Sequence, residues 1–302
     1  MLATLLAIFV RVILPVAVIV LMGYVAARSL AVDQRSLSRL ALYVLVPCMV
    51  FAGMARTSLT AQELVQIFAF VALSVALLWP VSAAAARLLG LRQSEANAFH
   101  LGTLLTNGVN VGFPVLALAF GQAGLERGMV YAVGMQAVFQ TLGVYLAAGG
   151  RLTPGAAARR VFEVPGIYAL VLGLLVNWTG ARVPDFLFDP IKMVGDSLVP
   201  LLLILLGMQL TEVRFDGFVR IAVTAAVLRL VVSAGLAALI TAVLGLSGVT
   251  RQALIAEASM PSAIIGLILA QEFDCHPQLV TAIISVTTVA CMVSLTVILA
   301  IV

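Results

Sequence analysis

Leu101-Gly-Thr-Leu-Leu-Thr-Asn-Gly-Val-Asn-Val-Gly-Phe-Pro-Val115 lies inside an apolar run from about Ala96 to Gly121, which is long enough to cross a bilayer. The middle of this run holds two amides and three helix-weakening residues: Asn107, Gly108, Asn110, Gly112 and Pro114. Proline lacks an N–H and crowds the preceding turn, and glycine permits backbone angles that unwind a helix. The stretch therefore predicts a broken helix, with one half at about Ala96–Thr106 and the other at about Phe113–Gly121.

A break in a membrane helix points to a binding site. Backbone that is freed at membrane depth is tolerated only where it is buried in protein or lines a water-filled cavity. The broken helix is accordingly a candidate solute site. A proline kink, in which the amides only satisfy the freed backbone groups, is the structural alternative.

The composition indicates an all-α polytopic membrane protein. Of the 302 residues, 63% are hydrophobic and 10% are charged, whereas soluble domains carry about 25% charged residues. The net charge of +4 arises from loop arginines, so it signals orientation in the membrane and gives no reason to expect a nucleic-acid partner. The three cysteines and two histidines are scattered, so we expect no disulfide framework, no zinc site and no cofactor.

The hydropathy pattern predicts ten membrane spans, five in each half of the chain. The first half (1–150) holds spans at about Thr4–Ala27, Leu37–Met54, Leu64–Leu88, Ala96–Gly121 and Gly128–Ala148. The second half (151–302) holds spans at about Val164–Trp178, Ile191–Leu210, Phe218–Leu244, Gln252–Gln271 and Pro277–Val302. The loops are short, so we expect one integral membrane unit with two halves.

Proline and glycine recur in the same order in both halves. The matching pairs, each offset by about 150 residues, are Pro15/Gly23 with Pro165/Gly173, Pro47/Gly53 with Pro200/Gly207, and Pro114 with Pro261. Three matches in order indicate a duplication. Because each half has an odd number of spans, the second must enter the membrane from the opposite side, which makes an inverted repeat with broken, crossing helices 4 and 9.

Loop arginines and lysines predict the orientation. One side of the membrane receives ten of them and the other receives six. The side with more basic residues is normally cytoplasmic. The 149–163 connection is then cytoplasmic, and both termini, including Val302, face outward.

Asn110 and Glu257 occupy matching positions at the two predicted breaks. Each lies four residues before a proline, Pro114 or Pro261, so the repeat makes their positions equivalent. The N-terminus of a half-helix favours an anion, and unwound carbonyls and half-helix C-termini favour a cation. A site of this kind can hold both.

Glu257 is predicted to couple transport to an ion, because ionisable groups near the middle of a membrane are costly and mark functional sites. Ser259 and Thr106 offer further oxygen ligands for a sodium ion at Glu257, while burial of the carboxylate makes a proton an equally reasonable coupling ion. A structural pair between Glu257 and Arg229 is the alternative. Arg229 is itself a candidate counter-ion for an anionic substrate.

The remaining candidate substrate residues follow from position. They comprise Asn107, Asn110, Gly112 and Pro114 in the first break, Met260, Pro261 and Ser262 in the second, Gln136 and Gln140 on one face of span 5, and Arg229 in span 8. The two glutamines, together with Thr141, would line a cavity or would only bond neighbouring helices.

The sequence resembles the auxin efflux carrier family, within the superfamily of bile-acid, arsenite and riboflavin transporters. The residues that carry the resemblance are the Asn-x-x-Asn-x-Gly-x-Pro pattern of 107–114, the prolines that open spans 1 and 2, and Glu257-Ala-Ser-Met-Pro-Ser262. The resemblance implies two inverted five-helix repeats, crossing helices 4 and 9, an elevator-like movement and carboxylate substrates. A short central loop implies a bacterial-type carrier of the inner membrane. Glu257 also resembles the crossover glutamate of bile acid:sodium symporters.

The sequence thus predicts a secondary active transporter of small organic anions such as malonate, malate or auxin-like acids, coupled to Na⁺ or H⁺. The rival predictions are a sodium-coupled bile-acid-type symporter and a non-transporting membrane receptor or scaffold. An enzyme is not expected, because neither an HExxH motif nor paired aspartates lie in the spans. The expected partners are the organic anion and the lipid bilayer, and the oligomeric state is open, with a homodimer as one option.

Overall fold

The computed structural model describes residues 10, 14–30, 32–149, 162–212 and 217–302, which form helices joined by turns. The one β-type pairing within these ranges is an antiparallel bridge between Thr106 and Ser262. The predicted all-α class is confirmed. The start of span 1 and most of the 149–163 connection, including the region around Gly155, lie outside the described residues.

The helices of the first half follow the predicted spans closely. Their bounds are α2 (Leu14–Ser29), α3 (Gln34–Leu40), η2 (Ala41–Leu45), α4 (Val46–Ala55), α5 (Ala61–Leu88), α6 (Gln93–Leu104), η3 (Gly108–Gly112), α7 (Phe113–Val138), η4 (Phe139–Gly143) and α8 (Val144–Ala147). Spans 4 and 5 are not separated by a loop. A single residue within α7, Gly121, divides them by leaving helical geometry at φ 63°, ψ −156°, a conformation that glycine adopts at no steric cost.

The helices of the second half are also close to the prediction. Their bounds are α10 (Pro165–Thr179), α11 (Asp185–Asp196), α12 (Leu198–Gln209), η5 (Leu210–Glu212), α13 (Val219–Ala226), η6 (Val227–Val232), α14 (Ser233–Val243), α15 (Gly248–Ala258), α16 (Ile264–Glu272) and α17 (Pro277–Ile301). The helix of span 7 begins at Asp185, earlier than predicted, because α11 adds an amphipathic segment before the apolar α12.

Six segments of the described chain are long and apolar enough to cross a membrane: Gln34–Ala55, Ala61–Leu88, Gly108–Ala147, Asp185–Gln209, Val219–Val243 and Pro277–Ile301. Leu14–Ser29 and Pro165–Thr179 are apolar but shorter. Breaks divide spans 4 and 9 into pieces, and 108–147 runs through two predicted spans. The count therefore neither reaches ten nor tests the inverted repeat, which stays a prediction.

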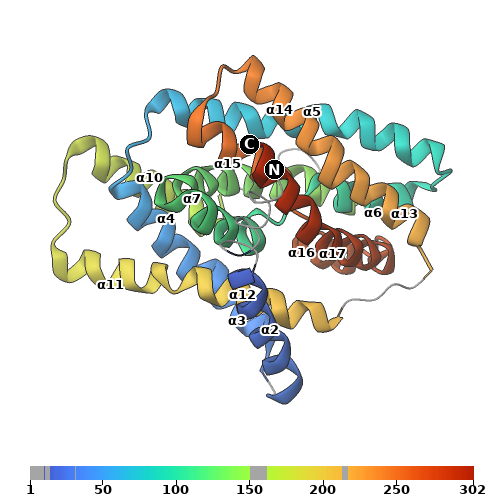
Figure 1. The fold of residues 1–302 in the computed structure, drawn as a ribbon, viewed down its shortest axis with the longest axis horizontal. Helices are drawn as coiled ribbons and strands as arrows, with labels where there is room; N and C mark the ends of the chain where they lie inside the picture. The colour runs from blue at the N-terminus through green and yellow to red at the C-terminus, as the bar shows by residue number, and fades with distance from the viewer. Residues whose placement is uncertain (1–9, 11–13, 31, 150–161, 213–216) are drawn as a thin grey trace.

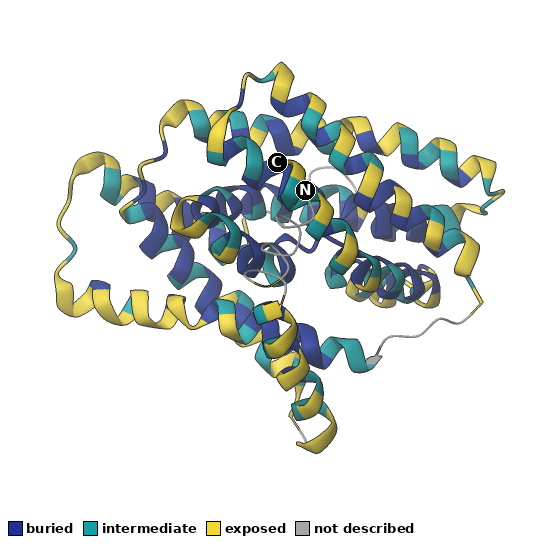
Figure 2. Ribbon diagram, viewed as in Figure 1, coloured by how far each residue is buried: buried dark blue, intermediate teal, exposed yellow. Residues whose placement is uncertain are grey.

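The outer faces of several helices are apolar. Met22 of α2, Val65 of α5, Leu172 of α10 and Val293 of α17 are each more than half exposed. In Figure 2 the buried residues gather along the inner faces, while α2 and α11 carry broad exposed surfaces. Large apolar side chains exposed on the outer faces of apolar helices are typical of helices that face lipid.

The helices pack in two groups (Figure 1). In the first group α2 packs on α12, and α4 packs on α10 and α11. In the second group α15 packs on α7 and α14, α13 packs on α17, and α5 packs on α6. The two groups meet chiefly where α12 contacts η3 and α7, with smaller contacts from α4 and α10 to α7.

Glycines bring the backbones of α2 and α12 into contact. A Cβ atom added to Gly207 would lie 1.9 Å from the carbonyl oxygen of Val20, and one added to Gly23 would lie 2.1 Å from that of Ile204. Small residues permit this close approach of helices in membranes, where dispersion contacts replace the hydrophobic effect as the main attraction. The glycines that marked the sequence repeat thus fix the packing of the first group.

Candidate functional site

Two broken helices cross at the centre of the second group. α6 ends at Leu104 and α15 ends at Ala258, and the chain is extended or turned until η3 and α16 begin. Where they cross, the two breaks exchange backbone hydrogen bonds: the N–H of Asn107 donates to the carbonyl of Pro261 at 2.8 Å, and the N–H of Ala263 donates to that of Leu105 at 2.9 Å. The freed backbone groups of the two breaks therefore hydrogen-bond to each other, as they must where no water is available inside the membrane.

The register of the crossing differs from the one that the prolines predicted. The bridge pairs Thr106 with Ser262. Asn110 lies after its break, in η3, whereas Glu257 lies before its break, in the last turn of α15. The two residues are thus not equivalent about the crossing. The reason is that Pro114 sits in the first turn of α7 and does not make the break, while Pro261 sits within its break.

Ser262 anchors the second break. Its hydroxyl donates to the carbonyl of Gly102 at 2.5 Å, and its N–H donates to the hydroxyl of Thr287 on α17 at 3.2 Å. Ser262 is fully buried. The predicted residue therefore lies at the crossing, where its side chain ties the second broken helix to the first.

Arg229 links the C-terminal ends of both first half-helices. The side chain comes from η6 and is 2% exposed. Its Nη1 donates to the carbonyl of Thr103 at 3.0 Å, and its Nη2 donates to the hydroxyl of Ser233 at 2.5 Å and to the carbonyl of Ala258. The C-terminus of a helix carries about half a negative charge. The guanidinium thus compensates two such ends with one charge.

Glu257 is fully buried, and neither of its carboxylate oxygens has a hydrogen-bond partner in the described chain. No donor of Arg229 reaches it, so the predicted structural pair between these residues does not form here. A buried carboxylate without a hydrogen-bond partner is costly and calls for a functional explanation.

Three glycines surround the Glu257 carboxylate. A Cβ atom would lie 2.5 Å from an oxygen of Glu257 if added to Gly108, 2.6 Å if added to Gly112 and 3.0 Å if added to Gly128. Beside them, the Tyr131 ring would lie 3.5 Å from the Cβ added to Gly108. The absence of side chains at these positions makes the space that the carboxylate fills.

The other predicted ion ligands are occupied elsewhere. The Ser259 hydroxyl donates to the carbonyl of Ile255 in its own helix at 2.7 Å. The Thr106 hydroxyl lies 3.3 Å from the hydroxyl of Tyr131. Neither makes a hydrogen bond with Glu257.

The predicted substrate residues divide into two sets. Asn107, Gly112, Pro114, Met260 and Pro261 are buried at or beside the crossing, and Asn110 is half-buried in η3. Gln136 and Gln140 are half-buried in α7 and η4, and within the described residues no hydrogen bond joins either of them to the crossing. The neighbouring Thr141 hydroxyl donates to the carbonyl of Ala137 at 2.8 Å.

Sequence reasoning missed Gly128 and Tyr131. They lie three residues apart on α7, so they share the face that packs on α15. The sequence signal was present as a series of glycines at 121, 124 and 128, which in a membrane helix favours close contact with a neighbour.

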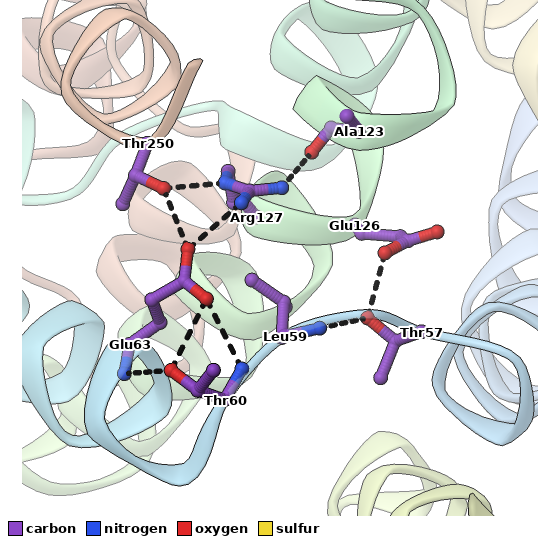
Figure 3. A network of polar contacts seen from close by, with 8 residues as sticks. All are labelled: Thr57, Leu59, Thr60, Glu63, Ala123, Glu126, Arg127 and Thr250. Atoms are coloured by element: carbon purple, nitrogen blue, oxygen red, sulfur yellow. Dashed lines mark hydrogen bonds and ion pairs between the residues drawn. The ribbon is translucent and has the colours of Figure 1, made fainter. Parts of the chain in front are cut away.

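A polar network ties the N-terminal ends of α5 and α15 to the middle of α7 (Figure 3). Glu63 forms an ion pair with Arg127 at 2.8 Å, and the Thr250 hydroxyl bridges them, accepting from Arg127 at 2.5 Å and donating to Glu63 at 3.0 Å. Nearby, Glu126 accepts a hydrogen bond of 2.6 Å from the Thr57 hydroxyl. The network fixes the N-terminal end of α15 and therefore the helix that carries Glu257.

A cavity of about 310 Å³ opens between the two helix groups and is lined by residues of α4, α7 and α11. Arg56, at the end of α4, stacks over the Phe188 ring with 3.8 Å between the guanidinium carbon and the ring centroid. Lys192 lines the same cavity and pairs with Asp196 at 2.5 Å. The cavity lining thus holds two cationic side chains, Arg56 and Lys192, and two carboxylates, Glu126 and Asp196.

Comparison with known proteins places the chain in a family. The model of the membrane transport protein family matches residues 8–148 and 151–299. An uncharacterized transporter of Methanothermobacter thermautotrophicus is 30% identical over 94% of this chain and 95% of its own length. An uncharacterized transporter of Methanocaldococcus jannaschii is 24% identical over 92% of this chain and 93% of its own length. The crossing therefore lies in a membrane transporter, not an enzyme, and the chain belongs to the membrane transport protein family, which is the auxin efflux carrier family.

Proposed function

We propose that the protein is a secondary active transporter of small carboxylates, such as malonate, malate or auxin-like acids, and that it couples their movement to a cation at Glu257. The observation that carries the proposal is the crossing itself. Two half-helix ends, a buried guanidinium and an unpaired buried carboxylate meet within a few residues of each other. Discontinuous helices of this kind form substrate and ion sites in secondary transporters.

The packing supports an elevator-type movement. The crossing belongs wholly to the second group of helices, and it meets the first group through η3, which packs on α12. A rigid second group that slides against the first would carry the crossing from one side of the membrane to the other. The contact of α2 with α12 joins span 1 to span 7, and the contact of α4 with α10 joins span 2 to span 6. Two inverted five-helix repeats should give these two contacts, because the symmetry between the repeats converts one into the other.

The proposed substrate site faces this boundary. Its members are Asn107, Asn110, Gly112, Pro114, Met260, Pro261 and Ser262 at the crossing, Gln136 and Gln140 on the neighbouring segment, and Arg229 through its charge. Arg229 supports an anionic substrate, because its buried positive charge forms no ion pair with a carboxylate in the described chain. The proposed setting is a bacterial inner membrane with both termini outward.

Uptake of radiolabelled malonate into proteoliposomes tests the proposal. Asn110→Ala should lower the initial rate about tenfold or more, because a hydrogen bond to a charged group contributes about 1.5–3 kcal/mol. Gln62→Ala, at an exposed position of α5, is the matched control and should transport at the wild-type rate. Normal uptake by a folded Asn110→Ala protein would remove η3 from the site.

The same vesicles test the rivals. Sodium-dependent uptake of taurocholate without uptake of malonate would indicate the bile-acid-type symporter. A folded protein that moves neither compound nor any other small carboxylate would favour a receptor or scaffold.

A further inference from the structure

The cation position at the crossing is already filled. In a crossing of broken helices, the carbonyls at the half-helix C-termini are the groups that coordinate a coupling cation. Here Arg229 donates to one such carbonyl from each helix, Thr103 of α6 and Ala258 of α15. Ala258 also accepts from Ser233 at 2.7 Å. These carbonyls are therefore committed to a charge that is part of the chain.

The surroundings of Glu257 do not resemble a sodium site. A hard cation needs several oxygen ligands at once. None of the predicted oxygen ligands makes a hydrogen bond with the Glu257 carboxylate: Ser259 donates to Ile255, Ser262 donates to Gly102, and Thr106 pairs with Tyr131. Side-chain carbons of Leu116 and Phe113 are the other close neighbours of a Cβ added to Gly128, beside the carboxylate. A small space closed off from solvent, with one carboxylate, suits a proton, which needs a single oxygen.

We propose that Glu257 binds the coupling proton, that Arg229 stands permanently in the place of a coupling sodium ion, and that transport is consequently independent of sodium. This inference rests on the proposed function for its transport part alone. The proton binds to one carboxylate oxygen of Glu257 on one side of the membrane and leaves the same oxygen on the other side.

Charge balance couples the proton to the anion. With Glu257 ionised, the crossing carries one positive and one negative charge, and an added anion is not compensated. With Glu257 protonated, the charge of Arg229 is left over, and an anion at the crossing balances it. Burial away from water makes each uncompensated charge costly, so proton and anion bind together and cross together.

Few other charges face Glu257. Among the described elements that pack on α15, η3 and α14 carry no titratable side chain. Tyr131 of α7 lies beside the carboxylate. The other titratable side chains on these elements and on α15 itself lie elsewhere. They are the ion pair of Glu63 and Arg127, near the N-terminal end of α15, Arg251 on α15, Glu126 on α7, Arg87 at the far end of α5, and Cys291 on α17. None of these is placed to neutralise Glu257.

Two measurements on purified, substrate-free protein test the site directly. Infrared spectra recorded while the pH is lowered should gain the carbonyl stretch of a buried protonated carboxylic acid, and Glu257→Gln should remove that band. Glu126→Gln is the matched control, because Glu126 is also buried but accepts a hydrogen bond from Thr57. The melting temperature should be the same in NaCl and KCl at equal ionic strength and pH.

A third measurement tests the coupling. The membrane potential is clamped at zero, sodium is absent, and the outside is about one pH unit more acidic than the inside. This inward proton gradient should drive about tenfold accumulation of malonate per coupled proton. Glu257→Gln should lose this response. Absence of the protonated band in wild type, its survival in Glu257→Gln, or sodium stabilisation that Glu257→Gln abolishes would each overturn the inference. If the band and sodium results hold while wild-type vesicles take up no carboxylate, the proposed function fails and the proton site stands.

Discussion

Replacement of Arg229 by methionine should destabilise the crossing strongly. Methionine keeps much of the volume of the side chain but removes the charge and all its donors. Hydrogen bonds to charged groups contribute about 1.5–3 kcal/mol each, and Arg229 makes three. The Ala258 carbonyl keeps the Ser233 donor, whereas the Thr103 carbonyl at the end of α6 loses its Arg229 donor. Removing one partner of a buried charged network typically costs about 3–5 kcal/mol.

Thermal unfolding in detergent measures this cost. At about 2 °C per kcal/mol for a chain of this size, Arg229→Met should lower the melting temperature by roughly 6–10 °C. Arg229→Lys keeps the charge but reaches fewer carbonyls, so its loss should be intermediate. Lys192→Met removes a cation from an exposed ion pair, which is worth about 0.3–0.5 kcal/mol, and serves as the control. A melting temperature of Arg229→Met equal to that of Lys192→Met would refute the role of the guanidinium at the half-helix ends.

Two further perturbations probe the glycine cradle and the orientation. Gly112→Ala would place a methyl group 2.6 Å from the oxygens of the buried carboxylate, so it should cost about 1–3 kcal/mol and lower malonate uptake. Gly235→Ala is the control: no atom lies within 4 Å of the added Cβ, so this change should be neutral or stabilise the protein by up to about 1 kcal/mol. Equal melting temperatures for the two variants would contradict the close contact between Gly112 and the Glu257 carboxylate. Cysteine at Leu88 should resist an impermeant thiol reagent in intact cells, while cysteine at exposed Arg182, across the membrane in the predicted topology, should react; labelling of the first alone would invert the orientation.

Much of the fold could be predicted because membrane helices have few alternatives. Without water, each backbone group must bond within its own helix, so apolar runs such as 277–302 became helices with nearly the predicted bounds. The break in span 4 was also predictable, since two amides and a proline do not fit a continuous lipid-facing helix. The end of span 4 at Gly121 was predicted, but the absence of a loop before span 5 was missed, because one glycine with a positive φ redirects the chain without a polar loop.

The site was predicted in composition but not in register. Glu257, Arg229, Asn107 and Ser262 all lie at the crossing, as their charge and polarity within apolar spans indicated. The contacts between these residues depend on which residues of the two breaks lie opposite each other. Alignment of the breaks by Pro114 and Pro261 predicted the wrong register. Proline fits the first turn of a helix as well as a break, so Pro114 could not mark the end of α6.

The two halves contribute different kinds of residue to the crossing. The first half supplies space around the carboxylate through Gly108, Gly112 and Gly128. The second half supplies both charges, Arg229 and Glu257. If the halves arose by duplication, the two copies of the original crossing carried the same charges. A carboxylate that is present in one copy alone then needs space between residues of the other copy. Gly108, Gly112 and Gly128 of the first half leave that space. The difference between the halves, more than their similarity, therefore locates the residues that we propose to bind the ion and the anion.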